Sequence, residues 1–328
     1  MDYSNDSNEK ETFINDIIDE IVDQFLSEFR LHLSALLPED SPAPPVSHPK
    51  FPETEEDYRE YAWGFIETNL GPFYQPGDAF VEELIRSAAA RAKDLTQEYE
   101  LEPEVTPKLL IMALYDFVIL CDDSGSMNKG DRIKVLEDTC QRVAQIAGLL
   151  QPQGVYLRFL NHKNDRNFDN LTDQEDIQGK MRAVKYSGKT RLGTVLKNKI
   201  IEPLIFEKAR SRQLERPIIT VIVTDGCPLG EETTCLEETV LNCKKRLGEL
   251  GFEPASAIFI ISQVGDDPEA VKFLTGLKAS TDLEEMLYCC PEQLDAQRDV
   301  FRKAGKDSQY SSYLIGLFEA ALVSQADI

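Results

Sequence analysis

Histidine is scarce in this chain of 328 residues, which has only three: His32, His48 and His162. A Ser-His-Asp hydrolase needs a histidine as its base, and the chain offers few candidates for that residue. His162 follows an apolar run at residues 155–160 that is typical of a strand, and we interpret it as an ordinary loop residue.

Basic residues are also in short supply. The chain has 35 Lys and Arg against 58 Asp and Glu, a formal net charge of -23, and no Lys/Arg stripe offsets it. This balance opposes binding to nucleic acid and to anionic membrane surfaces. No apolar run approaches membrane-spanning length, and the first residues lack the basic and apolar regions of a secretory signal. We therefore expect a cytoplasmic protein with neither a nucleic-acid nor a membrane partner.

The cysteines lack the paired spacing of a zinc site or a disulfide framework. They are odd in number and contain no Cys-x-x-Cys pair; the seven are Cys121, Cys140, Cys227, Cys235, Cys243, Cys289 and Cys290. This pattern favours reduced thiols in a cytosolic setting.

Polar side chains follow two strand-like runs in the second half of the chain. Residues 115–121 form an apolar run typical of a central parallel strand, and Asp122, Ser124 and Ser126 come directly after it. Alternate residues of an extended loop point the same way, so one carboxylate and two hydroxyls can converge on an ion. The run at 217–223 likewise ends in Thr224, Asp225 and Gly226.

Thr190, which lies between these two runs in the sequence, would supply one more loop. Together these loops offer two carboxylates, from Asp122 and Asp225, and three hydroxyls, from Ser124, Ser126 and Thr190. Such an all-oxygen set suits Mg2+ or Mn2+ far better than zinc. The carboxyl ends of the strands in an open parallel sheet are also where ligand-binding loops gather.

The pattern Asp-x-Ser-x-Ser, a distant Thr and a later Thr-Asp-Gly resembles the metal-ion-dependent adhesion site of von Willebrand factor type A (vWA) domains. Asp122, Ser124 and Ser126 match the first loop, Thr190 the second, and Asp225 the third. The resemblance covers roughly residues 101–328 and is closest to intracellular vWA proteins of fungi. It implies that the hydroxyls touch the ion, that the acids often act through water, and that an acidic side chain of a partner protein completes the coordination.

The resemblance also implies an α/β, Rossmann-like fold: a mainly parallel sheet with helices on both faces. We expect strands near residues 115–121, 155–160, 182–186, 217–223, 256–262 and 286–289, and helices near 131–150, 193–208, 231–250, 267–278 and 310–324. In the family one short edge strand is antiparallel, and 182–186 is the natural candidate. The final helix either slides when a ligand is captured, as in some relatives, or stays a fixed outer layer.

The first hundred residues divide into three segments. Residues 1–37 are an acidic N-terminus with an amphipathic helix at 12–37, and 38–53 form a proline-rich linker. Residues 54–100 form a helical segment, with helices at 54–70 and 78–99, and the vWA domain occupies 101–328. The sequence thus predicts one vWA domain with an N-terminal helical extension.

From these residues we expect an intracellular adaptor that captures an Asp or Glu of a partner protein through bound Mg2+ or Mn2+, rather than an enzyme. Two alternatives stay open: a scaffold subunit with a purely structural metal, and a metal-dependent hydrolase. A nucleotide site is disfavoured, because the P-loop pattern that ends at Lys189 and Thr190 would need its first glycine at Ala183. The sequence does not indicate the oligomeric state.

The thiol pattern generates a first prediction. In protein purified without reductant and then denatured, all seven cysteines should react with an alkylating reagent, because a reducing compartment leaves them as thiols. Intact-mass analysis counts the labels. Fewer than seven labels, restored to seven by prior reduction, would contradict the cytosolic assignment.

Overall fold

The computed structural model describes residues 52–98, 105–150, 154–163, 168–172, 174–305 and 309–326. The helix predicted at 12–37 lies outside these ranges, as does nearly all of the predicted linker at 38–53. None of the helices in the described ranges combines the length and the apolar character that crossing a bilayer requires.

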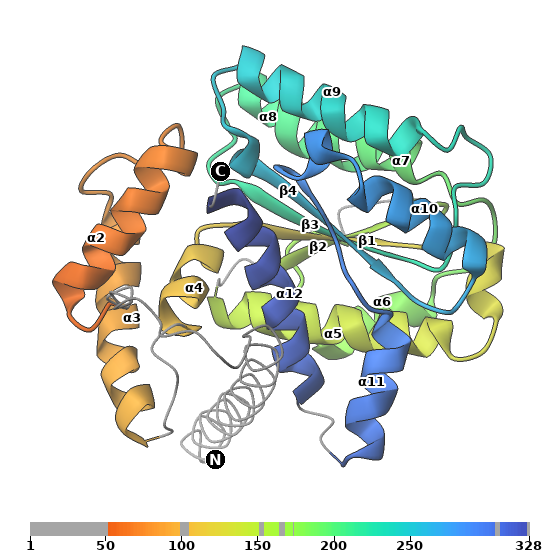
Figure 1. Ribbon diagram of the computed structural model, residues 1–328, viewed down its shortest axis with the longest axis horizontal. Coiled ribbons are helices and arrows are strands. Elements are labelled where there is room, and N and C mark those ends of the chain that lie inside the picture. Colours follow the sequence, from red (N-terminus) through yellow and green to blue (C-terminus); the bar gives the residue numbers. More distant parts are fainter. Residues whose placement is uncertain are drawn as a thin grey trace, which may run out of the picture.

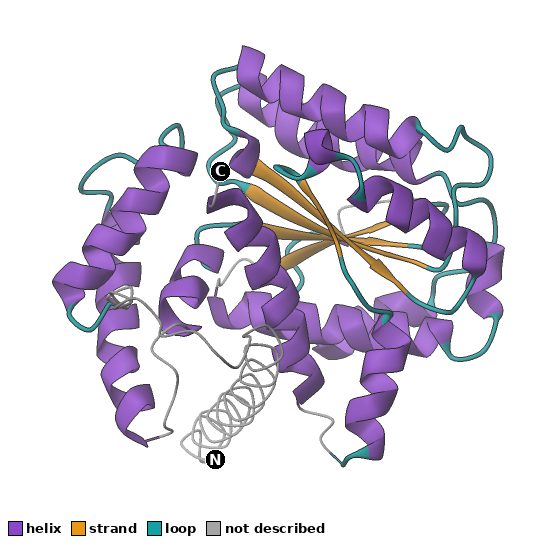
Figure 2. Cartoon of the chain, in the orientation of Figure 1, coloured by secondary structure: helices purple, strands orange, loops and turns teal. Residues whose placement is uncertain are grey.

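A five-stranded sheet forms the centre of the molecule (Figures 1 and 2). Its strands are β1 (Asp116–Cys121), β2 (Val155–Phe159), β3 (Ile218–Thr224), β4 (Ala257–Gln263) and β5 (Leu287–Cys289), in the order β2-β1-β3-β4-β5. Every neighbouring pair is parallel. After β1 the chain continues to β2 on one side and then returns to β3 on the other, so the winding reverses between β1 and β3. Ligands of open α/β sheets bind at such a reversal.

Helices cover both faces of the sheet, which confirms the predicted α/β, Rossmann-like fold (Figure 2). Alternate residues of β1 enter two separate apolar clusters, Phe117 and Ile119 in one, Val118 and Leu120 in the other. The first cluster takes in α5 (Arg132–Leu150), α6 (Gln174–Arg182), α11 (Leu294–Lys303) and α12 (Gln309–Ala326). The second takes in α7 (Leu192–Leu196) with its continuation through Lys197–Phe206, α9 (Cys235–Glu249) and α10 (Pro268–Lys278). The short helix α8 (Glu207–Arg210) follows Phe206 and buries none of its side chains.

The strand predicted at 182–186 is wrong, and within the described ranges the sheet has no antiparallel strand. Helix α6 ends at Arg182, and the following residues are coil. Their hydrogen-bonding groups are used elsewhere: the Val184 N–H donates to the Met181 carbonyl, and the Tyr186 carbonyl accepts from Asn128 Nδ2 at 3.0 Å. The outer edge of β2 instead meets Leu171, in an isolated antiparallel bridge to Val155.

Three helices have no counterpart among the predicted elements: α4 (Val105–Met112), α6 and α11. Helix α4 contains a short apolar run that periodicity alone cannot distinguish from a buried strand. Helix α11 buries only Leu294 and Phe301, so its apolar signal is sparse.

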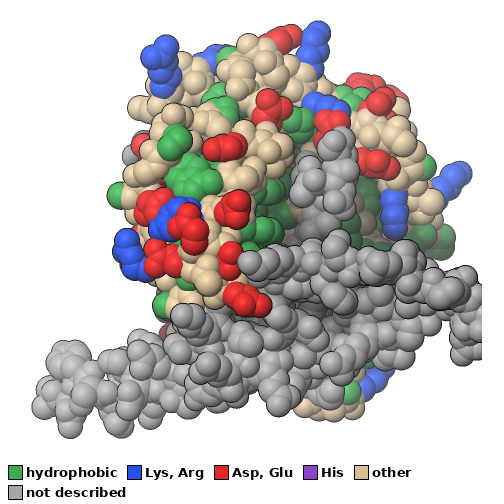
Figure 3. All heavy atoms as spheres, turned by 60° about the vertical axis from the view of Figure 1, so that its left-hand side comes forward, with side chains coloured by type: hydrophobic (Ala, Val, Ile, Leu, Met, Phe, Trp, Pro, Cys, Tyr) green, Lys and Arg blue, Asp and Glu red, His purple; other side chains and the backbone are tan. Residues whose placement is uncertain are grey.

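The helical segment before the sheet has the predicted helices. Helix α2 (Glu55–Phe65) continues through Ile66–Leu70, and α3 (Ala79–Glu98) begins at the predicted cap, where Asp78 Oδ1 accepts the N–H groups of Phe80 and Val81 at 2.9 and 3.2 Å. These helices share the first apolar cluster with the sheet. On their outer side exposed acids gather around α2 and α3 (Figure 3): Glu55, Glu56, Glu60, Glu67 and Glu83.

The final helix, α12, packs along the first face through the apolar side predicted for it. Leu314, Leu317 and Phe318 are buried, and the ring of Phe318 lies 5.7 Å from that of Phe117 on β1. A buried hydrogen bond of 3.0 Å joins Tyr310 Oη on α12 to Thr139 Oγ1 on α5. The helix is therefore held by both burial and a polar contact.

Tyr74 anchors the α2–α3 segment to the sheet domain and provides a second prediction. Its buried hydroxyl donates to the Leu114 carbonyl at 2.5 Å, just before β1. Tyr74→Phe should lower the free energy of unfolding by about 1–2 kcal/mol, because it leaves that carbonyl unsatisfied. Urea unfolding measures the change.

Tyr313→Phe is the matched control, since the Tyr313 hydroxyl is buried without a hydrogen-bond partner in the described residues. This change should cost nothing or stabilise the protein. Equal effects of the two substitutions would show that the Tyr74 contact does not anchor the segment.

Candidate metal centre

Four of the five predicted metal-site residues, Asp122, Ser124, Ser126 and Asp225, follow the carboxyl ends of β1 and β3, where the winding of the sheet reverses. Cys121 on β1 is in register with Val223 on β3, and the Asp122 N–H donates to the Val223 carbonyl at 2.9 Å. Asp122 therefore lies beside Thr224 and Asp225. This adjacency follows directly from the parallel pairing of two central strands.

Asp122 is held on both carboxylate oxygens. Oδ1 accepts the Ser124 N–H at 2.8 Å, and Oδ2 accepts the Thr224 hydroxyl at 2.6 Å. The residue is 1 % exposed. The first loop then turns through the short 3-10 helix Gly125–Asn128, which brings Ser126 over the third loop.

Hydroxyl groups connect the first loop to the third. Ser124 Oγ lies 3.0 Å from Ser126 Oγ, and the Ser126 hydroxyl donates to Asp225 Oδ1 at 2.8 Å. Asp225 is buried like Asp122. Four of the five predicted residues, Asp122, Ser124, Ser126 and Asp225, thus belong to one hydrogen-bonded network across adjacent strand ends.

Thr190, the fifth predicted residue, comes from a different part of the chain and is also buried. Its Oγ1 lies 4.0 Å from the place that a Cβ on Gly226 would take, so the hydroxyl faces the third loop. Its carbonyl accepts the Leu229 N–H at 2.8 Å. Glu231 reinforces this junction, since its carboxylate accepts the N–H groups of Gly193 and Thr194 at 2.8 and 2.9 Å.

Asp123, to which the sequence analysis gives no role, positions the loops. Its carboxylate accepts the N–H groups of Asn161 and His162, both at 2.7 Å, and its carbonyl accepts the Ser187 N–H at 2.7 Å. Asn161 in turn accepts the Lys189 N–H at 3.2 Å. Asp123 therefore joins the first loop to the loop after β2 and to the loop that carries Thr190.

Arg132 is a second residue that the sequence gave no reason to single out. It begins α5, and its Nη1 donates to Asp225 Oδ2 at 2.5 Å. The two carboxylates of the site therefore differ: Asp225 has a protein cation, whereas no Lys or Arg in the described part of the chain forms an ion pair with Asp122.

Burial raises the pKa of Asp122 from its ordinary value of 3.8 to about 6. The hydrogen bonds from Thr224 and Ser124 oppose this shift, and the neighbouring charge of Asp225 adds to it. A buried carboxylate without a counter-ion is costly, and a bound cation would relieve that cost. The site thus has the electrostatic character of a cation site.

The donor set fits a hard ion. Within the described residues, no three His, Cys, Asp or Glu side chains lie close enough to hold a metal between them. A metal here would depend on the hydroxyls of Ser124, Ser126 and Thr190, on the two acids and on water. Mg2+ and Mn2+ accept such oxygen ligands, and zinc prefers nitrogen and sulfur.

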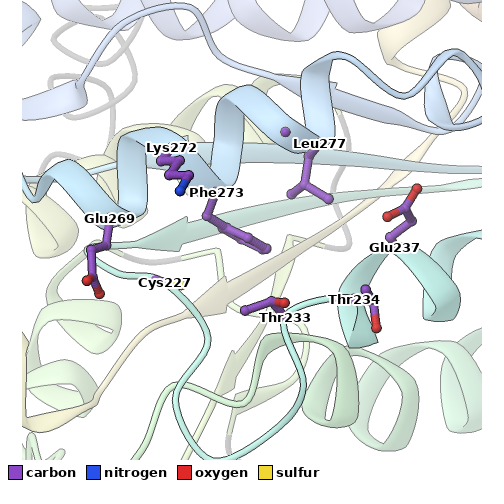
Figure 4. A pocket seen from close by; sticks show the side chains of 9 residues that line it. Cys227, Thr233, Thr234, Glu237, Glu269, Lys272, Phe273 and Leu277 are labelled. Atoms are coloured by element: carbon purple, nitrogen blue, oxygen red, sulfur yellow. The ribbon is translucent and has the colours of Figure 1, made fainter.

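A groove begins beside the third loop. Its wall includes Cys227, two residues after Asp225. The groove runs between α9 and α10 and has a volume of about 480 Å³. Figure 4 shows the Phe273 side chain pointing from α10 toward Thr233 on the opposite wall. Lys272 and Glu269 give the groove charge of both signs.

Comparison with known proteins adds little. No family model matches the chain, and no match exists among curated proteins. Among solved structures the human COPII-coat protein Sec24c is similar, with a TM-score of 0.35 and 10% identity, over 60% of this chain and 32% of that one. This chain thus spans about a third of that protein's length, and a TM-score this low supports no conclusion about fold or function.

Asp122 generates a third prediction, for metal-free protein. Its folded pKa of about 6 exceeds the ordinary 3.8, so the folded state binds more protons than the unfolded state between these values. Its contribution to stability is therefore complete below pH 4 and is lost as the pH rises through 6. From the difference between the two pKa values, the loss amounts to roughly 3 kcal/mol.

Urea unfolding of wild type and Asp122→Asn from pH 4 to 7, in buffer freed of divalent ions, measures this loss as a difference. Shifts that other acids contribute, such as Asp116 with its raised pKa, cancel between the two proteins. Parallel stability curves would show that Asp122 titrates normally.

Proposed function

We propose that this chain is a metal-dependent protein-binding module of the cell interior. In this proposal Asp122, Ser124, Ser126, Thr190 and Asp225 hold Mg2+ or Mn2+, and the ion captures an Asp or Glu carboxylate of a partner protein. The observation that carries it is the convergence of two buried acids and three buried or half-buried hydroxyls from three loops on one edge of the sheet, with no Lys or Arg of the described residues paired to Asp122. The match to the vWA adhesion-site pattern supports the same reading.

The hydrogen bonds leave the hydroxyl oxygens able to accept a cation. The Ser126 hydroxyl donates its proton to Asp225, so it accepts from Ser124 in their 3.0 Å contact and keeps a second lone pair for an ion. The Thr224 hydroxyl donates to Asp122 in the same way and fixes the carboxylate. A bound Mg2+ usually keeps waters where the protein supplies no ligand, and an incoming carboxylate can displace one of them.

The surroundings suit an acidic segment of a partner protein. Lys189 and Arg191, both exposed, flank Thr190 and supply positive charge at the rim. Leu229, on the third loop, is 62% exposed and offers an apolar contact beside the site. The groove that starts at Cys227 has room for residues that neighbour the captured acid.

A hydrolase is a weaker reading of the same loops, because metal-assisted hydrolysis also needs a positioned base or acid. His162, the one histidine in the described ranges, packs its ring against Phe159 and Phe168 at 5.8 and 5.5 Å. Its imidazole is therefore engaged in an aromatic cluster. We propose accordingly that the module is not an enzyme.

Metal binding is the fourth prediction. Asp122→Ala and Asp225→Ala should each weaken binding of Mn2+ by about tenfold or more, roughly 1.4 kcal/mol, because each removes a ligand or the acid that orients one. Asp116→Asn is the matched control, since Asp116 is an enclosed acid at the opposite end of β1. Isothermal titration calorimetry measures the affinities. Equal Mn2+ affinity in all four proteins would remove the site assignment.

Partner capture separates an adaptor from a scaffold with a structural metal. An adaptor should lose its bound partners from cell extract both on chelation and in the Asp225→Ala variant, and keep them in Asp116→Asn. Partners that survive chelation of a verified metal-binding protein would favour the scaffold reading.

A further inference from the structure

Arg132 lies in the candidate metal centre as a partly buried cation held by two contacts. Its Nη1 is 2.5 Å from Asp225 Oδ2 and 3.5 Å from the Ser126 carbonyl oxygen. The side chain of Arg132 is 12% exposed and that of Asp225 is 0% exposed. An ion pair this enclosed is screened far less by salt than one at the surface.

A slot in the backbone accommodates the guanidinium. Gly265, which follows β4, has a φ of 77°, and a Cβ there would lie 2.4–2.7 Å from atoms of the Arg132 guanidinium. The Gly265 N–H donates to Asp295 Oδ1 at 3.0 Å, and its carbonyl accepts from Gln263 Nε2 at 2.9 Å. The turn is therefore held, and the absence of a side chain makes the room that Arg132 fills.

The charges around the site show what this cation does. Asp122 and Asp225 together neutralise a dication, so a loaded centre built from these two acids alone would have no net charge to attract a carboxylate. Arg132 adds one positive charge. Asp123 points away, toward the loop after β2, where its charge is offset by Lys199. Asp266, 4.0 Å from Arg132 Nη2, has a side chain that is 96% exposed and is screened by water.

We propose that Arg132 is a specificity-determining residue, which gives the metal-loaded site a net positive charge and so makes it select an anionic carboxylate over a neutral oxygen ligand, at the expense of metal affinity. This inference rests on the proposed function, because it concerns the site with its ion. Beyond that function, the ligand must be negatively charged, and Arg132 is the residue that imposes this requirement. Arg132 acts through Asp225, whose second oxygen it occupies.

Two opposite effects follow from removing this charge. Arg132→Gln should bind Mn2+ about tenfold more tightly, because a nearby positive charge no longer opposes the dication. It should also lose about tenfold in its preference for acetate over acetamide, because the loaded site becomes neutral. A merely structural role for Arg132 would weaken both kinds of binding together.

The experiment uses the full chain in four forms: wild type, Arg132→Gln, Arg132→Lys and Arg298→Gln. Arg132→Lys keeps the charge and should behave as wild type. Arg298→Gln is the control that removes one positive charge away from the site. Arg298 lies on α11 and pairs with Asp138 on α5 at 2.8 Å. Calorimetry measures the Mn2+ affinity, and water-proton relaxation of the Mn2+-loaded proteins measures displacement of water by acetate and by acetamide.

The outcomes separate this inference from the function on which it rests. Tighter Mn2+ binding with a lost acetate preference in Arg132→Gln alone supports the proposal. Unchanged or weaker Mn2+ binding with an intact acetate preference overturns it and leaves the metal site standing. If Arg132→Gln binds Mn2+ and wild type does not, the result supports repulsion of the metal ion by Arg132 and overturns the proposed function. Absence of Mn2+ binding in all four proteins overturns both.

Discussion

The parallel pairing of β1 with β3 is the constraint on which the site depends. Their register places Cys121 beside Val223, so the residues that follow, Asp122 and Thr224, meet at one edge. Both strands are central and apolar, which fixes their pairing through burial on two faces. The register of the strands also fixes where the polar loops start, because each loop begins directly after the last residue of its strand.

The two acids of the site have different environments although they lie on adjacent strand ends. Asp122 accepts only neutral donors, Ser124 N–H and the Thr224 hydroxyl, and burial raises its pKa. Asp225 has a guanidinium on one oxygen and the Ser126 hydroxyl on the other. The unpaired negative charge of these two acids is therefore concentrated on Asp122, while Asp225 is paired with Arg132 and accepts the Ser126 hydroxyl.

Much of this arrangement is predictable from sequence because it depends on strand ends. Apolar runs before Asp122 and before Thr224 locate the loops, and parallel topology brings them together. The strand predicted at 182–186 does not form because backbone groups of this segment bond to Asn128 of the first loop and to Met181 of α6, and the contact with Asn128 is a tertiary one that the local sequence pattern does not record. Arg132 and Asp123 escaped notice for the same reason, since their partners, Asp225 and Asn161, are distant in the chain.

The negative charge of the whole chain repels the acidic ligand that the proposed function requires. A chain with a net charge of -23 repels an acidic partner at long range, and exposed acids on α2 and α3 contribute to that repulsion (Figure 3). Screening reduces this effect beyond about 8 Å at physiological ionic strength, whereas a contact inside the loops is much less screened. Attraction must therefore come from charges within the site and at its rim, Arg132, Lys189 and Arg191. A partner would then be selected by close fit of its carboxylate at this edge of the sheet, and general electrostatic steering would contribute little.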